Sequence, residues 1–164
     1  MSKAFTRESD EAVEAPLAPR RSPLPFGVKN LITPGGLRRI EGELAELCRD
    51  RPRLRDSETL AALLAIDRRI AQLQEVLRTA VEVPPPARED TLVRFGARVQ
   101  VRELNGGVIS YRIVGVDEAD FEENAISWRS PLAAALLNKR IGERTRVRLP
   151  GGEQWLEILG FSYH

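Results

Sequence analysis

This 164-residue chain is poor in the cysteine and histidine side chains on which disulfides, metal sites and histidine-based catalysis depend. There is one cysteine, Cys48, and one histidine, His164, which is the last residue. A histidine-based metal site or catalytic triad therefore has no partners from which it could be built, and an internal disulfide cannot form. We expect Cys48 to be a buried packing residue.

The densest cluster of charge lies between residues 49 and 58. Its arginines are Arg49, Arg51, Arg53 and Arg55, and its acids are Asp50, Asp56 and Glu58. Asp56 and Glu58 could open a helix, as an N-cap and as a first-turn acid that complements the helix dipole. The arginines would hold such carboxylates in ion pairs and oppose the binding of a divalent cation. Contact of the arginines with nucleic-acid phosphate is the alternative.

This charged cluster separates two stretches of helical periodicity. Apolar residues recur three or four positions apart on both sides of it: Leu37, Ile40, Leu44 and Leu47, then Leu63, Ile66, Ile70, Leu73, Leu77 and Ala80. A narrow apolar stripe on each helix predicts an antiparallel coiled-coil hairpin over residues 30–82. A two-helix part of an ordinary bundle is the alternative. The residues expected to pack together are Leu44, Leu47, Ile70 and Leu73.

The ends of the two helices are predicted from caps and prolines. The first helix should begin after Thr33, a good N-cap that is followed by a proline. Pro52 should either end this helix near Asp50 or kink it. We favour a kinked helix that continues to about residue 55, because it makes the arms nearly equal. The second helix should begin at Asp56 or Ser57 and run to about residue 81.

The segments on either side of the hairpin have a different composition. Residues 1–29 combine mixed charge with dispersed prolines, which predicts a disordered or loosely attached tail. Three consecutive prolines, Pro84, Pro85 and Pro86, predict a stiff linker over residues 83–91. Because few contacts should cross this linker, we expect the hairpin to behave independently of the residues that follow.

Residues 92–164 predict an α+β domain of about five strands with one helix across a face. Apolar residues alternate with polar ones from Val93 to Val101, and Asn105-Gly106-Gly107 is a strong hairpin signal before the run from Val108 to Val114. The remaining predicted elements are a strand at 125–128, a helix opened by Ser130-Pro131, and a closing hairpin around Pro150-Gly151-Gly152.

The whole chain carries 25 basic and 24 acidic side chains. No strong net field therefore draws it to nucleic acid or to a membrane. No apolar run approaches the roughly 18 residues of a membrane span, and the N-terminus lacks the apolar core of a signal peptide. We expect a soluble cytoplasmic protein that is a monomer and has no contact with a membrane.

Four blocks of sequence resemble the bacterial transcription elongation factors GreA and GreB, with GreB the closer of the two. The blocks are Lys29–Pro34, Ile66–Ile70, Tyr111–Gly115 and Ile126–Leu137, the last followed by Gly142-Glu143. The similarity covers nearly all of the chain from Lys29 onward. It implies a coiled-coil finger and an FKBP-like domain that docks on RNA polymerase, at the rim of its secondary channel, and that is not itself an enzyme.

The resemblance also implies how the partner is contacted. The residues of the block associated with polymerase binding are Trp128, Arg129, Ser130, Pro131 and Leu132. DNA and RNA would be met only through the polymerase complex. In the family, acids at the finger tip help to hold the polymerase Mg²⁺ and position a water, and the polymerase then cuts the 3′ end of backtracked RNA. Apart from this indirect role with Mg²⁺, no cofactor or metal site is expected.

The tip of the hairpin departs from the family pattern, which is close to Gly-Asp-x-Ser-Glu-Asn-x-x-Tyr. The nearest match here is Arg55-Asp56-Ser57-Glu58-Thr59, which lacks the asparagine and the tyrosine. The hairpin is also shorter by roughly eight residues an arm, which removes on the order of 12 Å of reach. Because a shift of even about 1 Å can disable a catalytic group, Asp56 and Glu58 are weak candidates for catalytic residues.

Three functions follow from these observations. We favour a Gre-like elongation regulator with weak or no stimulation of transcript cleavage. The alternatives are an active cleavage factor that uses Asp56 and Glu58, and a Rnk-like or antagonist competitor of full-length Gre factors. Prolyl isomerase activity is not expected, because its aromatic-lined pocket is hard to build from so few aromatic residues. Trp128 and Trp155 are expected in the core or on a docking surface.

Overall fold

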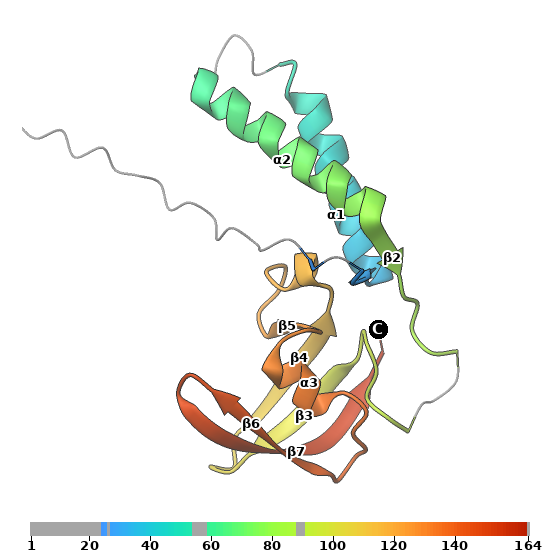
Figure 1. The fold of residues 1–164 in the computed structure, drawn as a ribbon, viewed down its shortest axis with the longest axis vertical. Coiled ribbons are helices and arrows are strands. Elements are labelled where there is room, and N and C mark those ends of the chain that lie inside the picture. Colours follow the sequence, from blue (N-terminus) through green and yellow to red (C-terminus); the bar gives the residue numbers. More distant parts are fainter. Residues whose placement is uncertain (1–23, 26, 54–58, 88–90, 164) are drawn as a thin grey trace, which may run out of the picture.

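The computed structural model describes residues 24–25, 27–53, 59–87 and 91–163. It consists of a helical hairpin and a globular domain built on a curled sheet (Figure 1). Most of the predicted tail lies outside the described residues, as do part of the predicted linker and His164. None of the described helices is long and apolar enough to cross a membrane.

The hairpin consists of α1 (Pro34–Asp50) and α2 (Leu60–Thr79), which lie side by side (Figure 1). The seam, where the apolar stripes of the two helices meet, is fully buried only near the globular domain. There Ile40 and Leu73 are 1% and 2% exposed. The leucines farther along α1, Leu44 and Leu47, are only partly buried. The apolar stripe therefore becomes increasingly open to water toward the tip.

The end of α1 and the start of α2 are set by local chemistry, and both differ from the bounds predicted on the assumption of nearly equal arms. The predicted kinked extension past Pro52 is wrong: α1 ends before it, because proline has no N–H to bond the carbonyl one turn back. The predicted start of α2 at Asp56 or Ser57 is also wrong, since Thr59 is its N-cap and accepts a hydrogen bond from the Ala62 N–H at 3.3 Å. With α1 at 17 residues and α2 at 20, no kink is needed to balance the arms.

Cys48 is exposed on α1, so its predicted packing role is wrong. It directly follows Leu47, which faces the seam. One residue turns an α-helix by about 100°, and this step carries the thiol away from α2.

Two short strands close the base of the hairpin. β1 (Asn30–Ile32) precedes α1, β2 (Ala80–Glu82) follows α2, and the two pair in parallel. The Val83 N–H extends the pairing by donating to the Ile32 carbonyl at 2.9 Å. This pair of strands was not predicted from the sequence, because three residues are too few to show an alternating pattern.

The globular domain is a five-stranded sheet with α3 (Pro131–Leu136) packed on one face (Figure 1). Its strands are β3 (Arg98–Glu103), β4 (Val108–Val114), β5 (Ala125–Ser127), β6 (Arg144–Leu149) and β7 (Gly152–Ser162), in the spatial order β5-β4-β3-β7-β6. β4 and β5 pair in parallel and the other neighbours are antiparallel. The predicted strand count and the short helix are confirmed, but β3 begins only at Arg98, since Val93 and Phe95 belong to the preceding loop.

The core of this domain lies between the sheet and α3. Its fully buried side chains are Val93, Ala97, Val99, Val101, Ile113, Ala133, Leu136, Leu156 and Ile158. The first hairpin turns where the sequence predicted: Gly106 has a φ of +87°, which favours glycine, and the Glu103 N–H donates to the Gly107 carbonyl at 2.8 Å.

The hairpin and the globular domain are in direct contact, contrary to the expectation that few contacts join them. β1 lies against η1 (Val116–Glu118), a 3₁₀ turn that follows β4. The Asn30 side chain donates to the Asp117 carboxylate at 3.1 Å, and the Arg39 guanidinium donates to the Phe121 carbonyl at 3.0 Å. These partners are far apart in the sequence, and no local pattern predicts such a contact.

Candidate functional site

The candidate acids of the hairpin tip, Asp56 and Glu58, lie outside the described residues. The neighbouring helix ends still test their predicted structural roles. α2 begins at Leu60, after both residues, so neither is its N-cap or its first-turn acid. Among the residues that the structure describes, no three histidine, cysteine or acidic side chains form a group that could hold a metal ion.

Two arginine–carboxylate pairs join the arms of the hairpin. Arg51 at the end of α1 donates to both carboxylate oxygens of Asp67 on α2, from Nε at 2.7 Å and from Nη2 at 2.6 Å. Arg69 on α2 donates in the same way to Glu43 on α1, at 2.6 and 2.8 Å. In each pair the hydrogen bond to the carboxylate raises the pKa of the arginine. Such two-pronged pairs fix the orientation of the partners as well as their charge.

The Arg51 pair changes the expected electrostatics of the tip. From the sequence, the arginines of this region were expected to pair with the carboxylates of the tip itself. Arg51 instead binds Asp67, and Arg53 lies 3.8 Å from Asp50 across an exposed turn. At least one of the four arginines is therefore directed along the hairpin and not toward its tip.

Neither pair was predicted from the sequence, although the register of the two arms could have revealed the pair between Glu43 and Arg69. In an antiparallel hairpin, residues at nearly equal distances along the two arms from a facing pair lie near each other. Glu43 is three residues beyond Ile40, and Arg69 is four before Leu73, so the buried Ile40 and Leu73 would have predicted that Glu43 lies near Arg69. Helix periodicity alone does not supply that register.

The five predicted polymerase-contacting residues differ in exposure: two are exposed, two are half-buried and one is buried. Arg129 and Pro131 are exposed. Leu132 is 8% exposed, and with Trp128 it packs into the core of the globular domain. Ser130 is the N-cap of α3, and its hydroxyl accepts a hydrogen bond from the third residue of that helix at 3.1 Å. Three of the residues thus shape the segment, while Arg129 and Pro131 are open to a partner.

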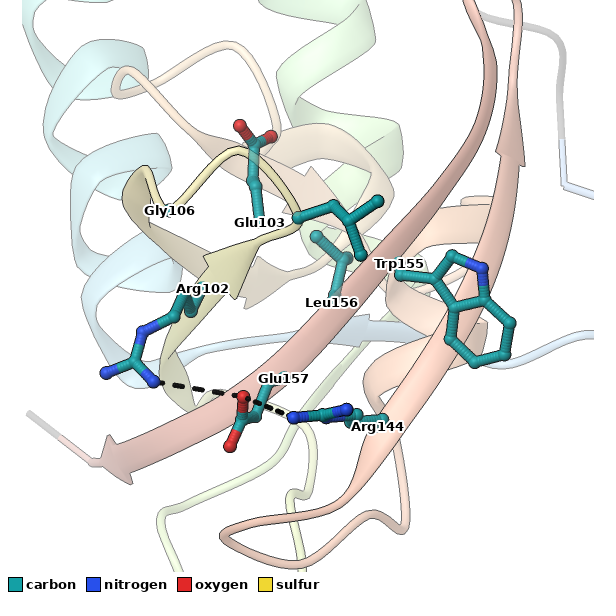
Figure 2. Close-up of a pocket in the computed structure, with 8 residues that line it drawn as sticks. Arg102, Glu103, Gly106, Arg144, Trp155, Leu156 and Glu157 are labelled. Carbon is teal, nitrogen blue, oxygen red and sulfur yellow. Dashed lines mark ion pairs between the residues drawn. The ribbon is translucent and has the colours of Figure 1, made fainter.

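A second candidate surface lies on the sheet face opposite α3. A depression of about 560 Å³ is bordered there by strands β3, β6 and β7. In Figure 2 the Glu157 carboxylate lies between Arg102 and Arg144, at 3.8 and 3.6 Å from their guanidinium nitrogens. Trp155 and Leu104, which also line the depression, are 47% and 85% exposed. An exposed tryptophan beside arginines is typical of a protein-binding surface.

The chain is similar to known proteins at three levels: a family model, related sequences and a solved structure. A family model described as Transcription elongation factor, GreA/GreB, C-term matches residues 88–163. Transcription elongation factor GreB of Neisseria meningitidis serogroup A is 36% identical over 154 residues, which cover 82% of this chain and 94% of that protein. Transcription elongation factor GreA of Bacillus anthracis is 43% identical over 95 residues, which cover 57% of this chain and 60% of that protein.

The solved structure of a transcription elongation factor GreA/GreB from Nitrosomonas europaea is also similar. It is 20% identical, covers 83% of this chain and 99% of its own, and has a TM-score of 0.42.

Proposed function

Because this chain belongs to the GreA/GreB family of transcription elongation factors, we propose that it binds RNA polymerase and regulates elongation with little or no stimulation of transcript cleavage. The chain is not itself an enzyme in this proposal. It works in the cytoplasm as a monomer and meets nucleic acid only within the polymerase complex.

The observation that carries this proposal is the length of the hairpin. α1 has 17 residues, which at about 1.5 Å per residue span roughly 26 Å. We take the hairpin to be the coiled-coil finger of the family, with the globular domain FKBP-like and docked at the rim of the secondary channel. A finger shorter by roughly eight residues an arm would leave its tip on the order of 12 Å short of the polymerase Mg²⁺. Acids at that distance cannot be metal ligands.

The first test uses an exposed residue of the docking segment, by which we mean the predicted polymerase-contacting residues 128–132. Arg129→Glu reverses the charge of an exposed side chain in this segment without touching the core. We expect it to weaken binding to core polymerase by about tenfold or more, as losing a charge pair at an interface does. Arg148→Glu is the matched control, because Arg148 is also exposed but lies on β6. Equal affinities of the two variants and the wild type would reject this docking segment.

One observation favours the alternative of an active cleavage factor. Because Asp67 occupies the Arg51 guanidinium, less positive charge is available to oppose a metal ion at the tip, and Asp56 and Glu58 could still assist the polymerase Mg²⁺. A Rnk-like or antagonist role is the third possibility. In that role the hairpin occupies the channel mouth and competes with full-length Gre factors.

A cleavage assay on backtracked transcripts decides among these functions. We expect the wild type to add little cleavage, to reduce the cleavage stimulated by a full-length factor, and to be unaffected by Asp56→Asn or Glu58→Gln. Strong cleavage that is lost in either variant but kept in the control Asp50→Asn would establish the active factor. Absence of both binding and competition would reject the polymerase proposal.

A further inference from the structure

An acidic side chain is buried where the hairpin meets the globular domain. Glu118, the last residue of η1, is only 3% exposed. Glutamate is almost never buried to this extent unless its carboxylate is hydrogen-bonded, because removing the charge from water is costly. The contacts of Glu118 therefore show what this junction requires.

The Glu118 carboxylate binds groups from both parts of the molecule. One oxygen, Oε2, accepts from the backbone N–H of Thr33 at 2.9 Å and from that of Gly115 at 2.8 Å. The other, Oε1, accepts from the Thr33 hydroxyl. Thr33 is the N-cap of α1, and its hydroxyl also accepts from the Gly36 N–H at 3.0 Å. One carboxylate thus joins the start of the hairpin to the turn after β4, at a helix N-terminus that favours negative charge.

Two glycines allow the close approach of chain segments around this carboxylate. A Cβ atom on Gly36 would lie 2.6 Å from Glu118 Cγ and closer still to the carboxylate, and one on Gly115 would lie 2.3 Å from the Leu31 carbonyl oxygen and 2.6 Å from Glu118 Oε2. Neither glycine has a positive φ, so close approach and not backbone conformation requires them. At Gly35, one residue earlier in α1, the nearest atoms would be 3.9 Å away.

Further contacts surround the carboxylate. The Asn30 amide donates to the Asp117 carboxylate at 3.1 Å and to the Thr79 hydroxyl at 3.3 Å, so it joins the end of α2 to η1. The Arg39 guanidinium lies 4.5 Å from the centre of the Phe121 ring. A rotation of the hairpin about any one of these contacts would break the others.

We propose that Glu118 is the positioning residue that fixes the angle between the hairpin and the globular domain. The two parts then move as one body, and the docking of the globular domain alone determines where the hairpin tip lies. The functional consequence rests on the proposed binding to polymerase, whereas the fixed angle itself does not.

The distance between two spin labels tests the fixed angle in the full chain. Cys48 is exposed on the hairpin and is the chain's one cysteine, and Gln100→Cys provides the second label at an exposed position of β3. The doubly labelled protein with no further change should give one narrow distance distribution, and so should the same protein with Gly35→Ala. Gly36→Ala should widen it by about twofold or more, as expected for domains whose interface no longer holds them.

Glu118→Gln and Thr33→Ser provide the chemical arm of the test. Glutamine has the shape of glutamate but points an NH₂ group at one of the donors, so we expect a widened distribution. Serine keeps the hydroxyl and the backbone N–H, so we expect the narrow one. Circular dichroism confirms that each variant is folded. If Gly36→Ala and Glu118→Gln both keep the wild-type distribution, the proposal is overturned.

A polymerase-binding assay on the same variants separates this proposal from the proposed function. Gly36→Ala should bind core polymerase within about twofold of the wild type, because the docking segment is unchanged, but should compete less well with a full-length factor. If even the wild type fails to bind, the proposed function is wrong, while the distance distributions still decide the role of Glu118. Widening without any change in competition would reject the functional consequence.

Discussion

The two ends of the hairpin are held by different forces. At the base, Ile32, Ile40 and Leu73 are at most 2% exposed, and the buried Glu118 carboxylate ties the start of α1 to the globular domain. Toward the tip, the arms are joined by arginine–carboxylate pairs that remain partly exposed, and Leu60 and Leu64 are 73% and 54% exposed. Apolar burial stabilises in proportion to the area removed from water, whereas exposed ion pairs contribute little.

This difference suggests that the two ends of the hairpin have different roles: the base positions the hairpin, and the tip carries whatever chemical groups act on a partner. The base sets the direction in which the hairpin points. The far half contributes little to stability, so its sequence can change with few structural consequences. A hairpin held in this way can therefore change in length and tip sequence while its base keeps the same geometry. The predictions that follow test this contrast between base and tip.

The largest effect is expected for Leu73→Ala. It leaves a cavity in the buried cluster at the base and should lower the free energy of unfolding of the hairpin by about 2–4 kcal/mol. The matched change on the same helix, Leu64→Ala, removes a mostly exposed side chain and should change it by about 0.5 kcal/mol or less. Thermal and urea unfolding followed by circular dichroism measure both. Equal losses would contradict the contrast.

Because the base is packed against η1, Leu73→Ala should also affect the globular domain. Tertiary signals of that domain should change in this variant. Independent melting of an unperturbed globular domain would instead support the expectation that the hairpin behaves independently of it.

The sequence predicted the elements that have local patterns. The helical stripes gave α1 and α2, Asn105-Gly106-Gly107 gave a hairpin, and Ser130-Pro131 gave the start of α3. Each of these features repeats or caps within a few residues, so its signal survives in a single sequence.

The junction was missed for a physical reason. Glu118 follows Asp117 in a segment without periodicity, and its partner Thr33 lies in another part of the chain. A buried carboxylate is specified by donors that only the folded chain assembles. Thr33 was recognised as an N-cap, and only the structure shows that the same residue also binds Glu118. The tip acids fall outside the described residues, so their role stays a prediction.

The second-largest effect concerns two adjacent glycines: replacing Gly35 or Gly36 with alanine should change the stability of the hairpin in opposite directions. Alanine is a better helix former than glycine by about 0.5–1 kcal/mol, so Gly35→Ala should stabilise the hairpin slightly. Gly36→Ala has the same intrinsic gain, but its Cβ would displace the Glu118 carboxylate, and overpacking of this kind costs about 1–3 kcal/mol. Urea unfolding should show opposite shifts in the midpoint. Stabilisation by both changes would mean that the junction tolerates a Cβ.

A smaller effect is expected for the ion pair between Glu43 and Arg69. A double-mutant cycle with Glu43→Gln and Arg69→Met should give a coupling of at most about 1 kcal/mol, since solvent screens partly exposed pairs. The coupling should fall as salt is raised, because the Debye length shortens from about 10 Å at 0.1 M to about 3 Å at 1 M. The loss in Leu73→Ala should not depend on salt in this way. A coupling that is large and independent of salt would show that the far half is held as firmly as the base.

The smallest effect is expected for an exposed ion pair near the base, which tests whether burial or nearness to the base determines how much a contact stabilises the hairpin. Glu75 and Arg78 lie near the base end of α2, but their side chains are exposed and pair at 2.6 Å. The hydrogen bond from Arg78 lowers the pKa of Glu75 from its ordinary value of 4.5. A lowered pKa means that the pair's contribution is present above the ordinary value and is lost as the pH falls through the lowered one. An NMR titration of the Glu75 carboxyl should therefore have its midpoint below the ordinary value, and Arg78→Gln should raise it. The same variant should leave unfolding at pH 7 unchanged within error, because salt and water screen an exposed pair wherever it lies. A marked loss of stability would show that nearness to the junction, and not burial, distinguishes the base from the tip.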